Sequence, residues 1–570
     1  MSQGVLSESA GSGNLATAET SATGDARQAR RILPDEPQRA GTMRPVRLEW
    51  AALTAIYALL RTNIVAIPLE RDEGLFGYIG QIIVDGGLPY RDAVDHKPPV
   101  VHYIYALAAW LLPSTATAIH TFAHVYTFGT LLACYCLAKA LTGSPSAGWW
   151  TALSFAVVSS LPSLHGFAAS TEMFLLLPAT LGLWCAVLAA RNRHVRLLAL
   201  SGAMGSLAFL TKQTGGLLAL FTAIYVVVSA YHRSWPFRRK LSAMVTWGLL
   251  WMLGFLAPIA FVAAYFGVRG GLSDLIHWVV TYNLEYTTQS EGAAIARLTP
   301  LLKATAFEAL PLTLAAIGAA IFLLARRLPV GLFVVGFLGF SLLAIVPGAA
   351  YPHYLAQLAP AMALASGIGL SRLCAGFPWR AWRRDLKIGA CALIVLSPVA
   401  THSKYYLTGT ADELSRDLYG GNPFPEAKRV ADFVAARTTK DEHVFVLGSE
   451  AEILFQARRR SPTRFPLKYP LTATWSKRSH EYQKTVMATI ATAPPRYIIV
   501  VPCVASHQRD TTAGYPLGDF VAELTKSHYR LEAIQPVTDP MSDLIHGDAL
   551  TKTSVPGDIA KDSLFIYRRL

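Results

Sequence analysis

The sequence predicts a polytopic α-helical membrane protein with about 11 to 13 transmembrane helices and a small C-terminal extracytoplasmic α/β domain. Of its 570 residues, 52% are hydrophobic and only 15% are charged, and the mean hydropathy is +0.35. A single soluble core of this length cannot bury so much apolar sequence. The apolar character ends near residue 401, and the remaining residues have the composition of a soluble domain.

Residues 1–45 are predicted to be a disordered cytoplasmic tail. They are rich in Gly, Ser, Ala and Thr and lack the apolar stretch of a signal peptide. Arginines close to the first apolar run, among them Arg44 and Arg47, favour a cytoplasmic position for this end of the chain.

Residues 46–400 are predicted to form the transmembrane domain, with a first outer loop at 68–119. About eleven apolar runs in it reach spanning length. They lie near 49–67, 120–142, 145–162, 171–190, 196–211, 214–231, 243–266, 308–325, 329–347, 354–373 and 388–400.

The basic residues indicate how these runs cross the membrane. The net charge of +14 does not indicate nucleic-acid binding, because Lys and Arg cluster in short runs between apolar segments. Threading the runs alternately places every later cluster on the cytoplasmic face: 191–196, 232–240, 326–327 and 379–387. The agreement requires that 99–113, which is short and bounded by prolines, lies in or on the outer leaflet without crossing.

This threading predicts a multi-pass protein of the inner (plasma) membrane with a cytoplasmic N-terminus and a periplasmic or extracellular C-terminal domain. It also gathers the polar segments on the outer face: 71–113, 165–173, 211–216, 267–307 and 347–360. No internal repeat of fixed period is visible, which argues against an inverted-repeat transporter.

Residues 401–570 are predicted to form the extracytoplasmic α/β domain. Its expected elements are helices at 423–439 and 479–493 and strands at 442–448, 495–501 and 563–569. Gly448, Ser449 and Glu450 follow the first of these strands without a glycine-rich fingerprint, so we interpret them as an ordinary strand-to-helix turn.

The first outer loop carries an unusual density of charge. Residues 72–87 predict an amphipathic helix at the membrane surface, with Asp72 as N-cap and Gly86 and Gly87 ending it. Asp72 and Glu73 are neighbours whose side chains diverge at a helix start, so a symmetrical acid-base pair is not expected. The alternative for both is capping and solvated surface charge.

Two basic residues follow in the motif "DHKPP". Pro98 pushes Lys97 into an extended conformation and fixes the approach to the next helix. His96 and Lys97 are then expected at the depth of the lipid headgroups, where a cation can meet a phosphate. Ordinary snorkelling is the alternative.

Several segments together resemble the GT-C membrane glycosyltransferases. They are "RDE" after the first run, "LFGYIGQIIVDGGLPYRDAVDHKPP", "STEMFLLLPATLGLW", "FLTKQTG" and "YPHYLAQLAP". Within these enzymes the chain resembles glycosyltransferase family 39, with the protein O-mannosyltransferases and the lipid A aminoarabinose or galacturonosyl transferases. The resemblance covers roughly residues 45–375, and the combination is more specific than any single segment.

The resemblance implies an activity. Such enzymes move a sugar, with inversion, from a polyprenyl-phosphate carrier to an acceptor on the outer face of the membrane. It also implies that Asp72 is the catalytic base and that Glu73 is the second acid. Because a polyprenyl phosphate is a good leaving group, catalysis needs a base on the acceptor and cations on the phosphate, not a strong general acid.

Further candidates lie in the other outward segments. Glu172 stands where the family often has an aspartate. Its expected role is to orient the acceptor or to hold a cation, and the alternative is that it is only a helix-start residue. Lys212 interrupts two apolar runs and is a candidate for phosphate binding. His353 and Tyr354 contact phosphate or sugar, or form a packed interfacial pair. Tyr90 completes the substrate-binding candidates.

The expected partners are a polyprenyl-phosphate-linked sugar, membrane lipids, and an envelope lipid, glycan or protein as acceptor, with no nucleic acid. No spacing of His, Cys, Asp and Glu specifies a metal site, so no obligatory metal is expected, although a divalent cation is possible. Three alternatives remain open: a transporter or flippase of lipid-linked saccharides, an oligosaccharide ligase with a diphosphate-linked donor, and a scaffold without catalysis.

Overall fold

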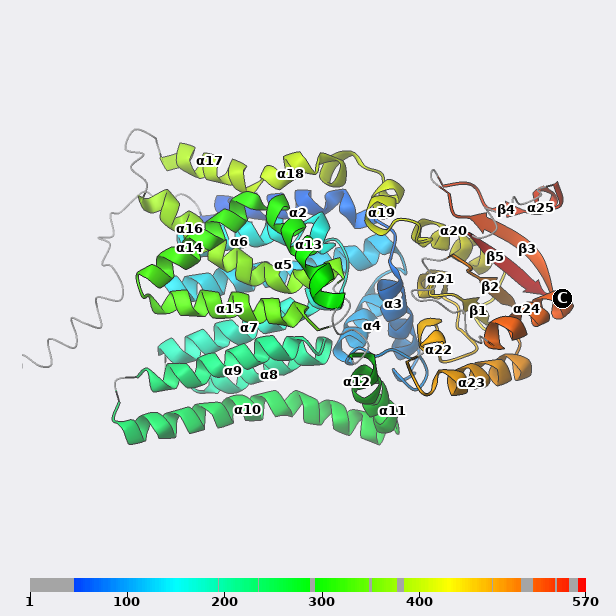
Figure 1. The fold of residues 1–570 in the computed structure, drawn as a ribbon, viewed down its shortest axis with the longest axis horizontal. Coiled ribbons are helices and arrows are strands. Elements are labelled where there is room, and N and C mark those ends of the chain that lie inside the picture. The colour runs from blue at the N-terminus through cyan, green and yellow to red at the C-terminus, as the bar shows by residue number, and fades with distance from the viewer. Residues whose placement is uncertain are drawn as a thin grey trace, which may run out of the picture. The chain divides into compact units, whose positions relative to one another are not determined.

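A computed structural model of the chain is shown in Figure 1. It describes residues 46–192, 194–233, 235–287, 293–347, 351–376, 384–473, 475–503, 516–538, 541–552 and 562–570. The chain divides into two compact units, Met1–Ala52 and Leu53–Leu570, and the arrangement described below is that of the second. The predicted tail, residues 1–45, lies outside the described residues.

Each apolar run predicted from the sequence coincides with a helix, and most of these helices run side by side in Figure 1. The helices are α2 (Val46–Thr62), α5 (Ala116–Thr142), α6 (Pro145–Val158), α7 (Thr171–Asn192), α8 (Arg196–Thr211), α9 (Gly215–Tyr231), α10 (Phe237–Val268), α14 (Leu310–Ala325), α15 (Pro329–Ile345), α16 (Ala359–Gly376) and α17 (Arg384–Val395). Their close packing rests in places on small residues: a Cβ added to Gly202 in α8 would meet the α10 backbone at Trp251 O, 1.9 Å away.

Four helices in the described ranges are long and apolar enough to cross a membrane: Ala116–Thr142, Thr171–Asn192, Phe237–Val268 and Pro352–Ala375. A fifth span results if the pair Ala296–Glu308 and Leu310–Ala325, which is bent by 99°, counts as one. The number of 11 to 13 spans stays a prediction.

Shorter elements connect the helices on the side that carries the polar loops. They are η1 (Ile64–Ala66), η2 (Pro162–Leu164), α11 (Leu272–Ile276), η3 (His277–Thr281), α12 (Tyr282–Thr287), α13 (Ala293–Glu308), η4 (Pro352–Leu358), α18 (Ser397–Thr401) and η5 (Lys404–Thr408).

The first outer loop forms two helices, α3 (Arg71–Val84) and α4 (Val100–Leu111). With 12 residues, α4 is too short to cross a bilayer. The helix α3 is more buried than the predicted amphipathic helix, because α4 covers one side of it and α21 (Ala451–Ala457) another, and its place at the membrane surface stays a prediction. Glycines permit this contact: a Cβ on Gly74 would lie 2.4 Å from Glu452 N.

The C-terminal region, residues 411–570, is built on a five-stranded sheet in the order β1-β2-β5-β3-β4. Strands β1 and β2 are parallel, and the other pairs are antiparallel. The strands are β1 (Val444–Leu447), β2 (Tyr497–Val500), β3 (Tyr529–Pro536), β4 (Ile545–His546) and β5 (Ser563–Arg569). The helices are α19 (Ala411–Tyr419), α20 (Phe424–Ala435), α21, α22 (Tyr469–Thr472), α23 (Ser479–Thr492), α24 (Pro516–His528) and α25 (Asp548–Lys552).

The three predicted strands and the two predicted helices of this region are present, whereas β3, β4 and α24 were not predicted. The region is attached directly to α3. Gln81 Nε2 donates to Phe455 O in α21 at 2.9 Å, and Tyr78 Oη accepts from Ser461 N at 3.0 Å. In Figure 1, α3 and α4 therefore lie between the bundle of long helices and the sheet.

Candidate active site

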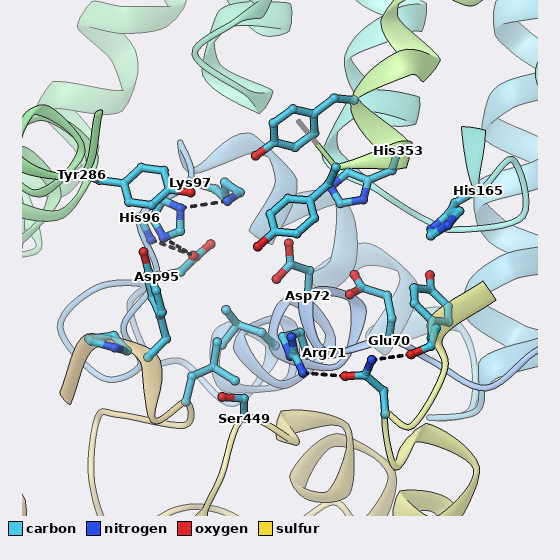
Figure 2. Close-up of a pocket in the computed structure, with 18 of the residues that line it drawn as sticks. Glu70, Arg71, Asp72, Asp95, His96, Lys97, His165, Tyr286, His353 and Ser449 are labelled. Atoms are coloured by element: carbon cyan, nitrogen blue, oxygen red, sulfur yellow. Dashed lines mark hydrogen bonds and ion pairs between the residues drawn. The ribbon is translucent and has the colours of Figure 1, made fainter. Parts of the chain in front are cut away.

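A cavity of about 460 Å³ lies where the polar loops of the helical part meet the C-terminal region (Figure 2). Pockets of this size hold small substrates or cofactors. The charged and hydroxyl-bearing residues around it come from four segments of the helical part and from three segments of the C-terminal region. The polar lining residues include Glu70, Arg71, Asp72, Asp95, His96, Lys97, His165, Tyr286, Arg297, Tyr351, His353, Tyr354, Tyr419, Asn422, Ser449 and Tyr469.

The start of α3 sets the orientation of the acids. The prediction that Asp72 caps this helix is wrong: Glu70 is the N-cap, in an extended conformation, and Glu73 completes a capping box. Glu70 Oε1 accepts from Glu73 N at 3.3 Å, and Glu73 Oε2 accepts from Glu70 N at 3.0 Å. Asp72 takes no part in this cap and borders the cavity, half-buried.

Glu73 points away from the cavity into the protein. Its Oε1 accepts from Ala169 N at 2.6 Å and lies 2.9 Å from Nε2 of His120. His120 is itself held by Val65 O, 3.1 Å from its Nδ1. The side chains of Asp72 and Glu73 thus diverge, as expected from their spacing, and the geometry suits Glu73 for positioning α3.

The motif "DHKPP" brings a cation to the cavity opposite α3. The Nζ of Lys97 lies 2.9 Å from His96 Nε2. Burial lowers the pKa of Lys97, but the negative charges of Asp72 and Asp95 outweigh burial and raise it. Burial, with Lys97 nearby, holds the pKa of His96 well below its usual range. A charged Lys97 beside a neutral His96 can therefore donate to an anion.

The backbone of this motif is fixed from several sides. Tyr90, which has a left-handed backbone with φ of 70°, donates its hydroxyl to Lys97 O at 2.7 Å. Gln213 and Asn283 both donate to His96 O, at 3.2 and 2.7 Å. Tyr90 is fully buried, so the structure places it behind the cavity wall and not in the lining.

Asp95 was not singled out from the sequence and lies in the same wall. Its Oδ1 accepts from His96 N at 2.6 Å, and its Oδ2 lies 3.3 Å from Nε2 of the buried His102. Burial raises the pKa of Asp95 to about 6, with Asp72 adding to the effect and Lys97 opposing it. Burial lowers the pKa of His102 to about 3, so this imidazole is neutral.

A second group joins four predicted residues. Glu172, at the start of α7, forms an ion pair with Lys212, and Thr171 Oγ1 donates to its Oε2 at 2.7 Å. His353 Nε2 lies 3.9 Å from Glu172 Oε1, and Lys212 Nζ lies 3.6 Å from the centre of the Tyr354 ring. His353 and Tyr354 line the cavity, whereas Glu172 and Lys212 lie behind them.

Several lining residues were missed in the sequence. Glu70 and Arg71 immediately precede Asp72, but only the fold shows that both border the cavity. Burial, reinforced by Asp72, raises the pKa of Glu70 well above its usual range. Arg297 and Tyr286 belong to the long loop 267–307, whose outward position was the only available signal. Within the described residues, no group of three or more His, Cys, Asp and Glu side chains could hold a metal ion.

Residues 96–261 match a family model described as dolichyl-phosphate-mannose-protein mannosyltransferase. No curated protein sequence matches the chain. The fold is similar to the crystal structure of ArnT from Cupriavidus metallidurans bound to undecaprenyl phosphate, with a TM-score of 0.58 and 14% identity over 85% of this chain and 95% of that one. It is also similar to the arabinofuranosyltransferase AftD from Mycobacteria, with a TM-score of 0.50 and 16% identity, covering 92% of this chain and 40% of AftD.

These comparisons confirm the resemblance to GT-C membrane glycosyltransferases that the sequence predicted. The likeness extends through the long helices and the C-terminal region, since it covers most of the chain. At these identities it concerns the fold, and the chemistry must be argued from the cavity.

Proposed function

We propose that this chain is a membrane glycosyltransferase that moves a sugar from a polyprenyl-phosphate carrier to an acceptor on the outer face of the membrane, with inversion. One observation carries the proposal: a carboxylate, Asp72, and an ammonium group, Lys97, border the same cavity from different segments. The GT-C fold and the match over 96–261 support this reading of the cavity.

In this reaction Asp72 is the base. The acceptor oxygen attacks the anomeric carbon, its proton passes to the carboxylate of Asp72, and the bond from the anomeric carbon to the phosphate oxygen breaks. Lys97 neutralises the departing polyprenyl phosphate, with Arg297 as a further cation of the lining. A phosphate leaving group needs no strong general acid, and a neutral His96 beside Lys97 is consistent with that.

The remaining predicted residues either position Asp72 and Lys97 or contact the donor. Glu73 holds α3 through His120 and Ala169 N. Tyr90 holds the backbone of Lys97. Glu172 and Lys212 support His353 and Tyr354, which are placed to contact the sugar or its phosphate.

The carrier is proposed to be a polyprenyl phosphate because the similar ArnT structure holds undecaprenyl phosphate, and because an ammonium group at the cavity suits a phosphate monoester or diester. The acceptor is an envelope lipid, glycan or protein. We propose that no metal ion is obligatory, since Lys97 and Arg297 supply cations to the phosphate. The site faces the outer side of the inner membrane.

The variant Asp72→Asn tests the base. Because Glu70 and not Asp72 caps α3, the amide should leave folding intact, but it cannot accept the proton at neutral pH. We expect the transfer rate to fall by about 10²- to 10⁴-fold. The measurement is transfer from an undecaprenyl-phosphate sugar to an envelope extract, with and without EDTA, and we expect EDTA to leave the rate unchanged.

Asp519→Asn, on the exposed side of α24, is the matched control and should transfer at the normal rate. Thermal stability and undecaprenyl-phosphate affinity are measured for both variants. A folded Asp72→Asn protein that transfers sugar at nearly the normal rate contradicts the assignment of the base.

A further inference from the structure

The C-terminal region supplies one wall of the cavity. Ser449 follows the carboxyl end of β1, Asn422 lies between α19 and α20, and Leu467 and Tyr469 come from the segment before α23. In open α/β sheets, ligands bind outside the carboxyl ends of parallel strands, and β1 is the parallel edge strand of this sheet. Ser449 thus lies beyond the carboxyl end of a parallel strand, a common place for ligand binding.

This wall is fixed in place. Lys468 N donates to Gly448 O at 2.8 Å, which joins the segment with Leu467 and Tyr469 to the turn after β1. Gly448 has no room for a side chain, since a Cβ would meet Val501 Cβ at 2.9 Å. On the other side, Asn422 Oδ1 accepts from Arg71 Nη2 at 2.9 Å, and Asn422 O accepts from Arg416 at 2.8 Å.

The wall lies across the cavity from Lys97, the cation proposed to neutralise the phosphate. In Figure 2, Asp72 lies between Lys97 and His353 on one side and Arg71 and Ser449 on the other. An inverting displacement requires the acceptor oxygen to approach the anomeric carbon from the side opposite the phosphate. Asp72, which lies between the two sides, can therefore accept the proton of an acceptor hydroxyl bound on the side of Ser449.

We propose that Arg71, Asn422 and Ser449 form the acceptor subsite, and that it binds the hydroxyl-rich sugar ring of a glycan or glycolipid. The inference rests on the proposed function, because the direction of attack comes from it. A hydroxyl and a guanidinium group are of the chemistry that matches vicinal sugar hydroxyls. Asn422, whose amide oxygen accepts from Arg71 and whose amide nitrogen donates to Tyr419 O at 2.6 Å, holds the guanidinium group in place. The aromatic side chains of Tyr419 and Tyr469, neither of them fully buried, also line the cavity and can offer apolar faces to a sugar ring.

Two variants test the subsite. Ser449→Ala removes one hydrogen-bonding group, and Ser449→Phe fills the space in front of the wall. Losing one neutral hydrogen bond should weaken acceptor binding by about 10-fold. We expect a larger loss for Ser449→Phe, with the affinity for undecaprenyl phosphate changed by less than about 2-fold in both.

Binding is measured by calorimetry with the full-length protein in nanodiscs, so the result does not depend on turnover. The probes are a soluble oligosaccharide fraction and a glycolipid fraction of the cell envelope, an unglycosylated Ser/Thr-rich peptide, and undecaprenyl phosphate. Ser527→Ala and Ser527→Phe, at an exposed position of α24, are matched controls expected to bind as the wild type does. The two saccharide fractions distinguish a free glycan from a glycolipid as the source of the sugar.

The subsite is supported if either saccharide fraction binds more weakly to the Ser449 variants but not to the Ser527 variants. Saccharide affinity that is absent in the wild type, or unchanged in both Ser449 variants, overturns it, as does peptide binding that Ser449→Phe abolishes. A protein that binds saccharide at Ser449 but transfers no sugar contradicts only the proposed function. A protein that transfers sugar with unchanged acceptor affinity in both Ser449 variants contradicts only the subsite.

Discussion

The two lysines at and behind the cavity wall differ in their interaction partners. Lys97 reaches the cavity next to a neutral His96, whereas Lys212 is committed to Glu172 and to the Tyr354 ring. Both lysines were predicted to bind phosphate, but only Lys97 belongs to the lining. An ammonium group already paired with a buried carboxylate contributes more to keeping that carboxylate charged than to binding a ligand.

The two lysines should therefore respond differently to truncation. Lys97→Ala should weaken undecaprenyl-phosphate binding by about 1.5–3 kcal/mol with little loss of stability. Lys212→Ala leaves Glu172, only 1% exposed, without its cation and should cost about 3–5 kcal/mol of folding free energy. Thermal unfolding and ligand titration of both variants measure this. The double variant Lys212→Met with Glu172→Gln is the control and should recover stability; the reverse pattern contradicts our reading.

Asp95 gives the protein a pH-dependent stability. Its pKa of about 6 in the folded state lies above the value of an unfolded aspartate, so the folded protein binds more protons between about pH 4 and 6. The free energy of unfolding should fall by roughly 3 kcal/mol as the pH rises through this range, and then stay level. Burial is the largest cause, and the facing groups are Lys97, Asp72, His96 and His102.

The measurement compares wild type with Asp95→Asn in thermal unfolding from pH 4 to pH 7. Other carboxyl groups titrate equally in both proteins, so the difference between the two curves isolates Asp95. We expect the asparagine variant to gain stability relative to the wild type as the pH rises. If the stability curves of the two proteins run parallel, the pKa of Asp95 is the same in the folded and unfolded states, which contradicts the prediction.

At the scale of elements, α3 joins the long helices to the C-terminal region. Its first turn carries Asp72, and its buried face contacts both α4 and α21. Of the glycines of α3, Gly74 lies closest to α21, since a Cβ added there would lie 2.4 Å from the backbone nitrogen of Glu452. The position of Asp72 thus depends on a contact with a segment almost 400 residues away in the chain.

Gly74→Ala should disturb this junction. The added methyl group forces α3 and α21 apart, and overpacking of this kind costs about 1–3 kcal/mol. We also expect reduced sugar transfer, because Asp72 lies two residues before the contact. Gly318→Ala in α14 is the control: nothing lies within 4 Å of its Cβ position, so alanine should be neutral or slightly stabilising. Equal stability and activity in the two variants contradicts the role of the junction.

The sequence predicted elements better than their ends. The apolar runs and the strands β1, β2 and β5 have strong periodic or continuous hydrophobic patterns, and all are present. The cap of α3 was misassigned because aspartate is the more common N-cap, whereas Glu70 is held by a capping box with Glu73. Strand β3 was missed because a register shift between Leu531 and Ala533 breaks its alternation.

Only part of the candidate site could be predicted from the sequence. Asp72, His96 and Lys97 stand out because ionisable residues are rare between apolar runs, and all three border the cavity. Asn422 and Ser449 carry no such signal, since polar residues are ordinary in a soluble region. Their place at the cavity follows from the contact between α3 and α21, which no spacing in the sequence reveals.

At the scale of the whole chain, the described residues that line the cavity all come from segments that the threading placed on the outer face. In the helical part these are the first outer loop, the turn with His165, the long loop with Tyr286 and Arg297, and the segment with His353. The rest of the lining comes from the region after residue 401. Because the charge-based threading made no use of contacts, this agreement supports the prediction that these segments share one side of the membrane.

The orientation itself can be tested with single cysteines on the exposed surface. The chain is predicted to keep its N-terminus in the cytoplasm and its C-terminal region outside, so Ser527→Cys in α24 should react with a membrane-impermeant maleimide in intact spheroplasts. Arg326→Cys, in a basic cluster between α14 and α15, should react only after the membrane is opened. Both substitutions are made in a chain whose six native cysteines are replaced by alanine or serine, and sugar transfer is checked first. Labelling of Arg326→Cys in intact spheroplasts, together with protection of Ser527→Cys, would show that the chain has the opposite topology. The cavity, Asp72 and the proposed transfer would then lie on the cytoplasmic side.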